Sequence, residues 1–116
     1  LDDRVTAVAA HVPAFCENTG HFHGRPRGWP GFVPEGNETI AKVGAYYDAV
    51  NCARHISCPV LMSVGFIDTT CPPTTVYSAF NVIKTSKLMV ASPTVGHDIT
   101  KESSEAEKEW IAKQIK

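Results

Sequence analysis

The chain has 116 residues, of which 43% are hydrophobic and 20% charged, and this balance indicates one globular domain, not a disordered segment. Its formal net charge of -1 excludes the strong positive field with which proteins attract nucleic acid or an anionic membrane. No apolar run is long enough to cross a bilayer, so we expect neither a nucleic-acid partner nor a membrane partner.

The first half of the chain predicts a buried strand, a long loop and a helix. Residues 4–12 (RVTAVAAHV) form a nearly continuous apolar run that Pro13 closes, which is typical of a buried strand. Glycines and prolines recur throughout residues 14–36, so we expect a loop or an insertion there. A helix is predicted from Asn37, its cap, to about residue 53, because apolar residues recur there at helical spacing. These apolar residues are Ile40, Val43, Tyr47 and Val50.

The second half begins with another strand and another helix. An apolar run at residues 59–67 indicates a second buried strand. Pro72 and Pro73 follow, at positions where the first turn of a helix tolerates proline. The buried face of this helix is predicted to consist of Val76, Phe80 and Ile83. Residues 87–91 (KLMVA) then predict a third short strand.

The last helix carries its own start signal. Ser104 and Glu107 match the S-x-x-E capping box, which predicts that the helix begins at Ser104. We interpret Glu105, Glu107 and Glu109 as a solvated first turn, not as a carboxylate site. The buried side of the helix is predicted to consist of Trp110, Ile111 and Ile115.

The order strand, helix, strand, helix, strand, helix predicts an α/β fold with about three parallel strands and covering helices. The nearly continuous apolar strands agree with a sheet that is covered on both faces. Three strands leave both edges of such a sheet exposed, which is unfavourable for an independent domain. We therefore expect the chain to be part of a larger α/β fold.

The cysteines and histidines show no metal-binding pattern. Four cysteines occur without a C-x-x-C pair, so we expect free, partly buried thiols and no zinc site or disulfide framework. They are Cys16, Cys52, Cys58 and Cys71. His21 and His23 form an H-x-H pattern without acidic or cysteine companions, and we interpret them as loop histidines. The compartment stays open between the bacterial cytoplasm and secretion.

Asp68 and His97 are the candidate catalytic residues. Asp68 follows the second predicted strand directly, and His97 follows the third after the short connection SPTVG. Because catalytic groups gather at the carboxyl ends of parallel strands, we expect both side chains on one rim. An aspartate that accepts a hydrogen bond from a histidine sets its tautomer, and the order Asp then His is that of the α/β-hydrolases.

Each of these residues also has a structural interpretation. An aspartate after a strand is often a turn former or a helix cap, and His97 after a glycine is compatible with a plain surface turn. The nucleophile is missing, because no G-x-S-x-G motif occurs. Ser63 is predicted to lie inside the second strand, and Cys71 lacks the sharp turn that presents a reactive thiolate.

Several segments resemble the acetyl xylan esterase and cephalosporin C deacetylase family. The residues that carry this resemblance are CPVLMSVGFIDTTCPPTTVYSAFN, YYDAVNCARHI before it, and VGHD after it. LDDRVTAVAAHVPAFC resembles the strand that follows the nucleophile in that family, and HGRPRGWPGF resembles a segment of some bacterial members. The resemblance implies that residues 1–116 are the C-terminal portion of a single α/β-hydrolase catalytic domain.

By this resemblance, Asp68 matches the acid of a catalytic triad and His97 matches its base. The resemblance also implies acetylated xylan or xylo-oligosaccharides as substrates, no cofactor, and a homo-oligomeric intact enzyme. The family's nucleophilic serine and oxyanion-hole donors lie in the N-terminal half, which these residues do not contain. We therefore expect the 116 residues alone to be inactive.

Trp29 and Phe32 are the candidate substrate-binding residues, because aromatic side chains can form a wall that stacks on a sugar ring. An equally good interpretation is that they hold the glycine-rich loop against the core. Three other functions stay open: an oligopeptidase-type serine peptidase, a dienelactone-type hydrolase, and a non-catalytic binding or assembly module.

Overall fold

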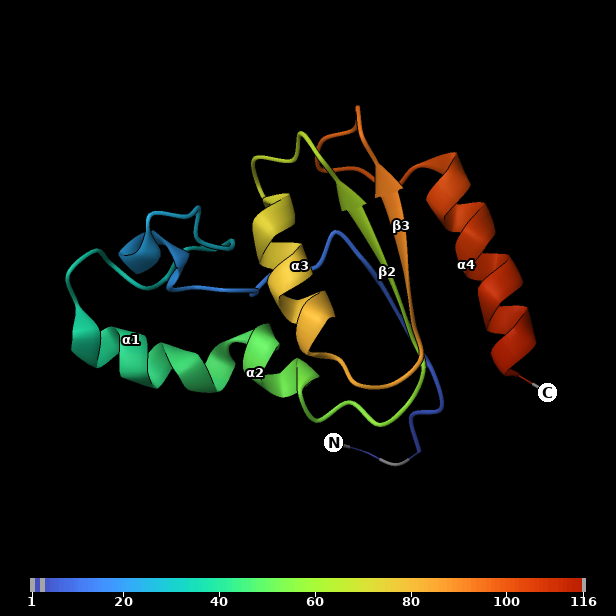
Figure 1. Ribbon diagram of the computed structural model, residues 1–116, viewed down its shortest axis with the longest axis horizontal. Helices are drawn as coiled ribbons and strands as arrows, with labels where there is room; N and C mark the ends of the chain where they lie inside the picture. The colour runs from blue at the N-terminus through green and yellow to red at the C-terminus, as the bar shows by residue number, and fades with distance from the viewer. Residues whose placement is uncertain (1, 3, 116) are drawn as a thin grey trace.

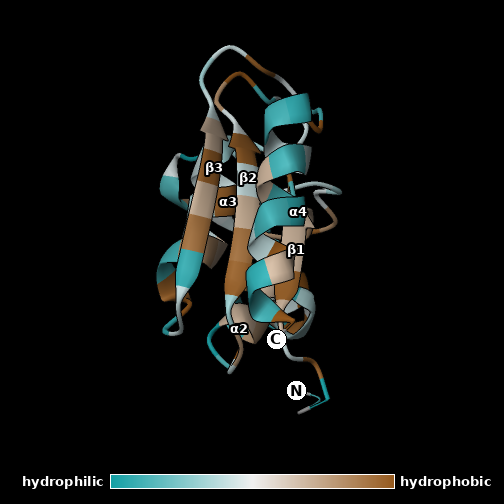
Figure 2. Ribbon diagram, turned by 90° about the vertical axis from the view of Figure 1, so that its right-hand side faces the viewer, coloured by the Kyte–Doolittle hydropathy of each residue, from teal (hydrophilic) through white to brown (hydrophobic). Residues whose placement is uncertain are grey.

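Three parallel strands form a sheet with helices on both faces (Figure 1). The computed structural model describes Asp2 and residues 4–115. The strands are β1 (Val8–His11), β2 (Val60–Gly65) and β3 (Lys87–Ser92), in the spatial order β1-β2-β3. Two long helices, α3 (Pro73–Val82) and α4 (Lys101–Gln114), cover opposite faces of the sheet (Figure 2). The α/β fold with three parallel strands is therefore confirmed.

The central strand β2 carries the core. All six of its residues are buried, because neighbouring strands cover both its edges and helices cover both its faces. Val60 and Met62 face α3, where they join a cluster with Ala79 and Ile83. Full burial of such apolar side chains stabilises the fold by about 1.5–3 kcal/mol each.

The first strand is shorter than predicted. A strand over residues 4–12 was expected, but β1 comprises only Val8–His11, the residues that lie opposite Val60–Ser63 of β2. Val12 has a φ of 39° and therefore leaves the extended conformation at once. β2 likewise ends at Gly65, and Phe66 and Ile67 beyond it are 45% and 63% exposed. The apolar runs therefore extend beyond the paired segments.

The prediction of a single helix from Asn37 to residue 53 is wrong, because the helical segment is interrupted at Asp48. It consists of α1 (Glu38–Gly44), the 3-10 turn η2 (Ala45–Tyr47) and α2 (Ala49–Ala53). Asn37 caps α1 as predicted, since its side chain accepts a hydrogen bond from the Ile40 backbone N–H. Asp48 has extended backbone angles and caps α2 through the Val50 N–H, so regular helix cannot continue through it.

The predicted buried face of this segment is also wrong over most of its length. Ile40 is 38% exposed, Val43 56% and Tyr47 67%. Only Val50, in α2, packs against the core cluster. The reason is visible in Figure 1, where α1 extends away from the sheet while α2 lies beside α3.

The last helix begins earlier than its sequence signal indicated. α4 starts at Lys101, and its cap is Thr100, whose hydroxyl accepts a hydrogen bond from the Ser103 N–H at 3.0 Å. Ser104 is therefore inside the helix, and the predicted capping box with Glu107 is wrong. Trp110 and Ile111 are half-buried as expected, but Ile115 is 74% exposed because it lies just beyond the last turn. Among the described helices, none has both the length and the apolar character to cross a membrane.

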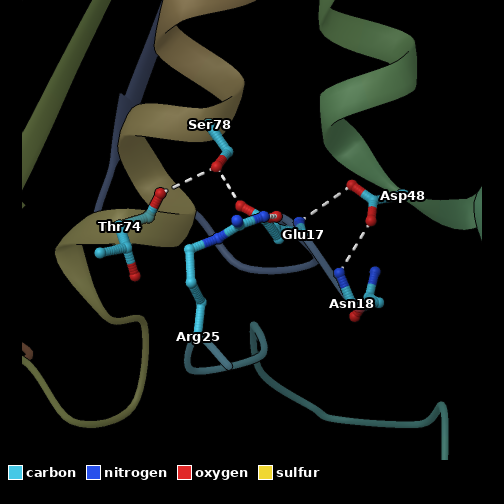
Figure 3. A network of polar contacts seen from close by, with 6 residues as sticks. All are labelled: Glu17, Asn18, Arg25, Asp48, Thr74 and Ser78. Carbon is cyan, nitrogen blue, oxygen red and sulfur yellow. Dashed lines mark hydrogen bonds and ion pairs between the residues drawn. The ribbon is translucent and has the colours of Figure 1, made fainter. Parts of the chain in front are cut away.

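A polar network holds the loop of residues 14–36 against the helices (Figure 3). The buried Asp48 carboxylate accepts hydrogen bonds from the backbone N–H groups of Glu17 and Asn18, at 3.0 and 2.8 Å. The Glu17 carboxylate accepts in turn from Ser78 of α3 and from Arg25 of the loop. The loop is therefore anchored to two helices by side chains that the sequence analysis did not single out.

The Glu17 carboxylate is stabilised in its charged form. Burial raises its pKa, but the hydrogen bonds from Ser78 and Arg25 and the Arg25 charge outweigh burial, so that the pKa lies below its ordinary value. A carboxyl group whose pKa is lowered in the folded state stabilises that state at pH values above the ordinary pKa of a glutamate. That contribution is lost as the pH falls through the lowered pKa.

Candidate active site

Asp68 lies three residues beyond β2, and the turn that follows it holds its carboxylate in place. Its Oδ1 accepts hydrogen bonds from the backbone N–H groups of Thr70 and Cys71, at 2.8 and 2.9 Å. The side chain is fully buried. Two backbone donors therefore orient one oxygen of the carboxylate, and the other, Oδ2, remains available for a different partner.

That partner is His97, which lies in the loop between β3 and α4. Its Nδ1 lies 2.9 Å from Asp68 Oδ2, and the imidazole is 44% exposed. An Nδ1–H that donates to the carboxylate leaves the lone pair on Nε2, which is the nitrogen that can accept a proton from a nucleophile. The prediction that the two side chains meet on one rim of the sheet is confirmed.

A close approach of two backbone segments brings these residues together. The Ile67 N–H donates to the Val95 carbonyl at 3.2 Å, and the Phe66 N–H donates to the Ser92 carbonyl at 3.1 Å. A Cβ atom on Gly65 would lie 2.4 Å from the Val95 oxygen and 2.2 Å from the Gly96 oxygen. Only glycine fits there, so Gly65 permits the contact between the end of β2 and the His97 loop. The sequence analysis missed this role, although a glycine inside an apolar strand-like run was a visible signal.

Neither Cys71 nor Ser63 is placed to act as the nucleophile of this pair. Burial, followed by the negative charge of Asp68, raises the pKa of the Cys71 thiol, which disfavours the reactive thiolate. The pKa of the Cys16 thiol is raised to about 12. Burial is the largest cause, followed by the charges of Asp48 and Cys71. Ser63 is buried inside β2, as predicted. All four cysteines are free, which confirms the expectation of unpaired thiols.

Trp29 borders a cleft beside the Asp68 turn. The cleft has a volume of about 330 Å³, and its walls are the loop at residues 27–31 on one side and Thr69 and Thr70 on the other. Trp29 is 52% exposed and packs edge-on against Phe15, with 6.3 Å between ring centroids. The structure thus brings Trp29 next to the residues that follow Asp68.

Phe32 occupies a different position. It does not border this cleft; it lies 6.2 Å from Phe15 between ring centroids and packs over Gly44 at the end of α1. Its place fits the interpretation in which an aromatic side chain holds the loop against the rest of the fold. Phe15 thus packs against both Phe32 and Trp29.

The two histidines of the H-x-H pattern lie in the 3-10 helix η1 (Gly20–His23) of the loop. The ring of His21 packs against Phe22, with 4.4 Å between ring centroids. Within residues 2 and 4–115, no three histidine, cysteine, aspartate or glutamate side chains converge in a way that could hold a metal ion.

Comparisons with known proteins agree with one another. Residues 30–114 match the family model described as acetyl xylan esterase (AXE1). Acetyl esterase Axe7A of Xylanibacter ruminicola is 39% identical over 123 aligned residues, which cover 100% of this chain and 27% of that protein.

Two solved structures are also similar. Acetyl xylan esterase from Paenibacillus sp. R4 superposes with a TM-score of 0.84 at 23% identity, over 98% of this chain and 39% of its own, and shows the shared fold. Acetyl xylan esterase 1 from Thermoanaerobacterium sp. JW/SL YS485 has a TM-score of 0.77 at 26% identity, over 97% of this chain and 39% of its own. The chain therefore spans 27% of the length of the curated relative and 39% of each of these two structures.

Proposed function

This chain belongs to the acetyl xylan esterase family, and on that premise we propose that it is the C-terminal catalytic portion of a serine ester hydrolase that removes acetyl groups from xylan or xylo-oligosaccharides. The observation that carries the proposal is the Asp68–His97 hydrogen bond at 2.9 Å, with the carboxylate buried and the imidazole partly exposed. This is the arrangement of the acid and the base of a catalytic triad.

The roles of the two residues follow from this geometry. Nε2 of His97 removes the proton from a serine hydroxyl as the serine oxygen attacks the acetyl carbonyl carbon. The resulting imidazolium is stabilised by Asp68 and then protonates the departing sugar oxygen. A water molecule, deprotonated by His97, then attacks the acetyl-serine carbonyl carbon. The imidazolium returns this proton to the serine oxygen as the acyl–oxygen bond breaks, and acetic acid is released, which ionises to acetate. The reaction needs no metal or organic cofactor.

We propose that the serine and the oxyanion-hole donors belong to the remainder of a longer protein, because the matched relatives are much longer than this chain. A G-x-S-x-G motif upstream would agree with an esterase or a peptidase, whereas a cysteine at its centre would favour a dienelactone-type hydrolase. The expectation that the intact enzyme is a homo-oligomer stays a prediction.

The proposed activity is tested by assaying the full-length protein with acetylated xylo-oligosaccharides. We expect release of acetate, with no cleavage of N-acetylated peptides, because the family match is to esterases. The 116-residue chain alone should release none and should resist labelling by a fluorophosphonate. Peptide cleavage without acetate release would show a peptidase, and absence of both activities would favour a non-catalytic module.

We also propose that the cleft beside Trp29 holds part of the sugar. The exposed Trp29 ring forms one wall, Phe32 supports it through Phe15, and Thr69 and Thr70 connect the opposite wall directly to Asp68. A sugar whose acetyl group lies at His97 would thus have an aromatic surface close by.

Replacing Trp29 with alanine should therefore raise KM for acetylated xylo-oligosaccharides by about 2–12-fold, which corresponds to the loss of about 0.5–1.5 kcal/mol of aromatic contact. The KM for a small acetyl ester without a sugar should change little. Phe22→Ala is the matched control, because Phe22 is an exposed aromatic residue of the same loop that does not border the cleft. An equal loss with both substrates, or an equal effect of Phe22→Ala, would contradict the assignment.

A further inference from the structure

A second histidine, His11, forms a polar bridge below the rim that carries Asp68 and His97. His11 is the last residue of β1, and its Nδ1 lies 2.8 Å from Ser63 Oγ in β2. Its Nε2 lies 2.9 Å from Oε2 of Glu107, which projects from α4. One side chain thus connects two strands and the helix that covers them.

This bridge is largely enclosed and its hydrogen bonds are complementary. The His11 side chain is only 11% exposed, the Glu107 side chain is 33% exposed, and Ser63 is 4% exposed. An imidazole with its proton on Nε2 satisfies all three groups, because Nε2–H donates to Glu107 while Nδ1 accepts from the Ser63 hydroxyl. The interpretation of Glu107 as part of a solvated helix start is therefore wrong. It failed because the partner lies 96 residues away in the sequence.

Although serine, histidine and glutamate are the residue types of a hydrolytic triad, these three do not form a second hydrolytic site. Ser63 is buried inside the central strand, and its hydroxyl is already engaged by His11. Because a nucleophile must be reachable by its substrate, the bridge is a structural connection.

The bridge acts on the helix that follows the catalytic histidine. His97 is four residues before the start of α4, so the position of α4 sets where the His97 loop ends. The other end of that loop is held by β3 and by the close contact at Gly65. Much of α4 is hydrophilic (Figure 2), and neither hydrophobic cluster of the described residues includes a side chain from it. The His11–Glu107 contact is therefore a specific attachment of α4 to the sheet.

We propose that His11 and Glu107 are positioning residues for His97: by fixing α4 on the sheet, they hold the His97 imidazole in register with Asp68. The inference rests on the proposed esterase function for its kinetic consequence, but its structural consequence is independent of the substrate. A displacement of about 1 Å at a reacting group lowers a rate by about 100-fold, so a small shift of α4 is enough to affect catalysis.

The test uses the full-length protein with Glu107→Ala, Glu107→Gln and Glu105→Ala. We expect Glu107→Ala to lower kcat for a small acetyl ester about tenfold with KM little changed, because orientation at the reacting group is lost while binding is kept. Glu107→Gln should recover most of the rate, since its amide oxygen can still accept from His11 Nε2–H. Glu105→Ala is the matched control, because Glu105 lies on the same helix and, among the described residues, pairs only with Lys101, at 3.6 Å and in solvent.

Two further measurements separate positioning from general stability. In a His97→Ala background, Glu107→Ala should cause no further fall in the residual rate, since coupled residues are not additive. In the ¹H NMR spectrum of histidine-labelled protein, the Nδ1–H resonance of His97 should broaden or disappear in Glu107→Ala and persist in Glu105→Ala. This second readout needs no substrate.

The outcomes are distinguishable. A wild-type protein that releases no acetate contradicts the proposed esterase function, while the Nδ1–H resonance still tests the positioning role. An active wild-type protein whose Glu107→Ala variant keeps its kcat and its Nδ1–H resonance overturns the positioning role. An equal tenfold fall in the His97→Ala background would also overturn it, because the effect would then not pass through His97.

Discussion

Replacing Asp68 with asparagine in the full-length protein should lower kcat for an acetyl ester by about 10⁴-fold, with KM little changed. The backbone N–H groups of Thr70 and Cys71 both donate to the Oδ1 position, so they select the amide oxygen there. The amide NH₂ must then face His97 Nδ1, which forces the imidazole proton onto Nε2. In that tautomer, Nε2 cannot accept the proton of the proposed serine nucleophile.

The control for this substitution is Asp98→Asn, the same chemical change in the adjacent loop position. Asp98 is exposed, and its carboxylate accepts a hydrogen bond from the Ile99 N–H, at 2.7 Å. The kcat of Asp98→Asn should stay within about twofold of the wild-type value, as is usual for a surface substitution away from the reacting groups. If Asp68→Asn kept more than about a tenth of the wild-type activity, Asp68 would not be the triad acid. The same would follow if Asp98→Asn lost as much activity as Asp68→Asn. Thermal unfolding of both variants would show that the fold is retained.

Replacing Gly65 with alanine should cause the second-largest loss, about 100-fold in kcat. The added Cβ would lie 2.2 and 2.4 Å from two backbone oxygens of the His97 loop, and backbone cannot rotate away as a side chain can. The loop must therefore shift, which separates His97 from Asp68. Overpacking of this kind should also destabilise the fold by about 1–3 kcal/mol.

Gly96→Ala is the matched control for Gly65→Ala. Gly96 precedes His97 directly, yet a Cβ there would meet only the Ile67 carbonyl oxygen, at an ordinary 3.8 Å. Its kcat and its unfolding temperature should therefore stay near those of the wild type. Steady-state kinetics measures kcat, and calorimetry measures the unfolding temperature. Equal behaviour of the two variants would mean that the close approach at Gly65 does not govern the position of His97.

Much of the fold could be predicted because the signals are local. The apolar run at residues 59–67 predicted the strand β2, and the prolines at 72 and 73 predicted the start of α3. Asp68 and His97 could be proposed as a pair because each lies a few residues beyond the end of a strand, and the carboxyl ends of parallel strands share one rim.

The local signals failed where a competing local or distant interaction was stronger. Thr100 caps α4 in place of Ser104, since it precedes Ser104 and has the extended backbone that a cap requires. Asp48 interrupts the periodic segment after Asn37, because its carboxylate binds backbone N–H groups of the loop some 30 residues earlier. Periodicity alone could not show that the apolar residues before Asp48 would face solvent.

The sequence by itself thus determined the order of the three strands and the two long helices along the chain, and the candidate acid and base. These features depend on residues that are neighbours in the chain. Only the tertiary structure decided that Gly65 admits the His97 loop, that Trp29 borders the Asp68 turn and that Glu107 binds His11. Each of these contacts joins segments that are far apart in the sequence, and the path of the backbone between them sets the distance.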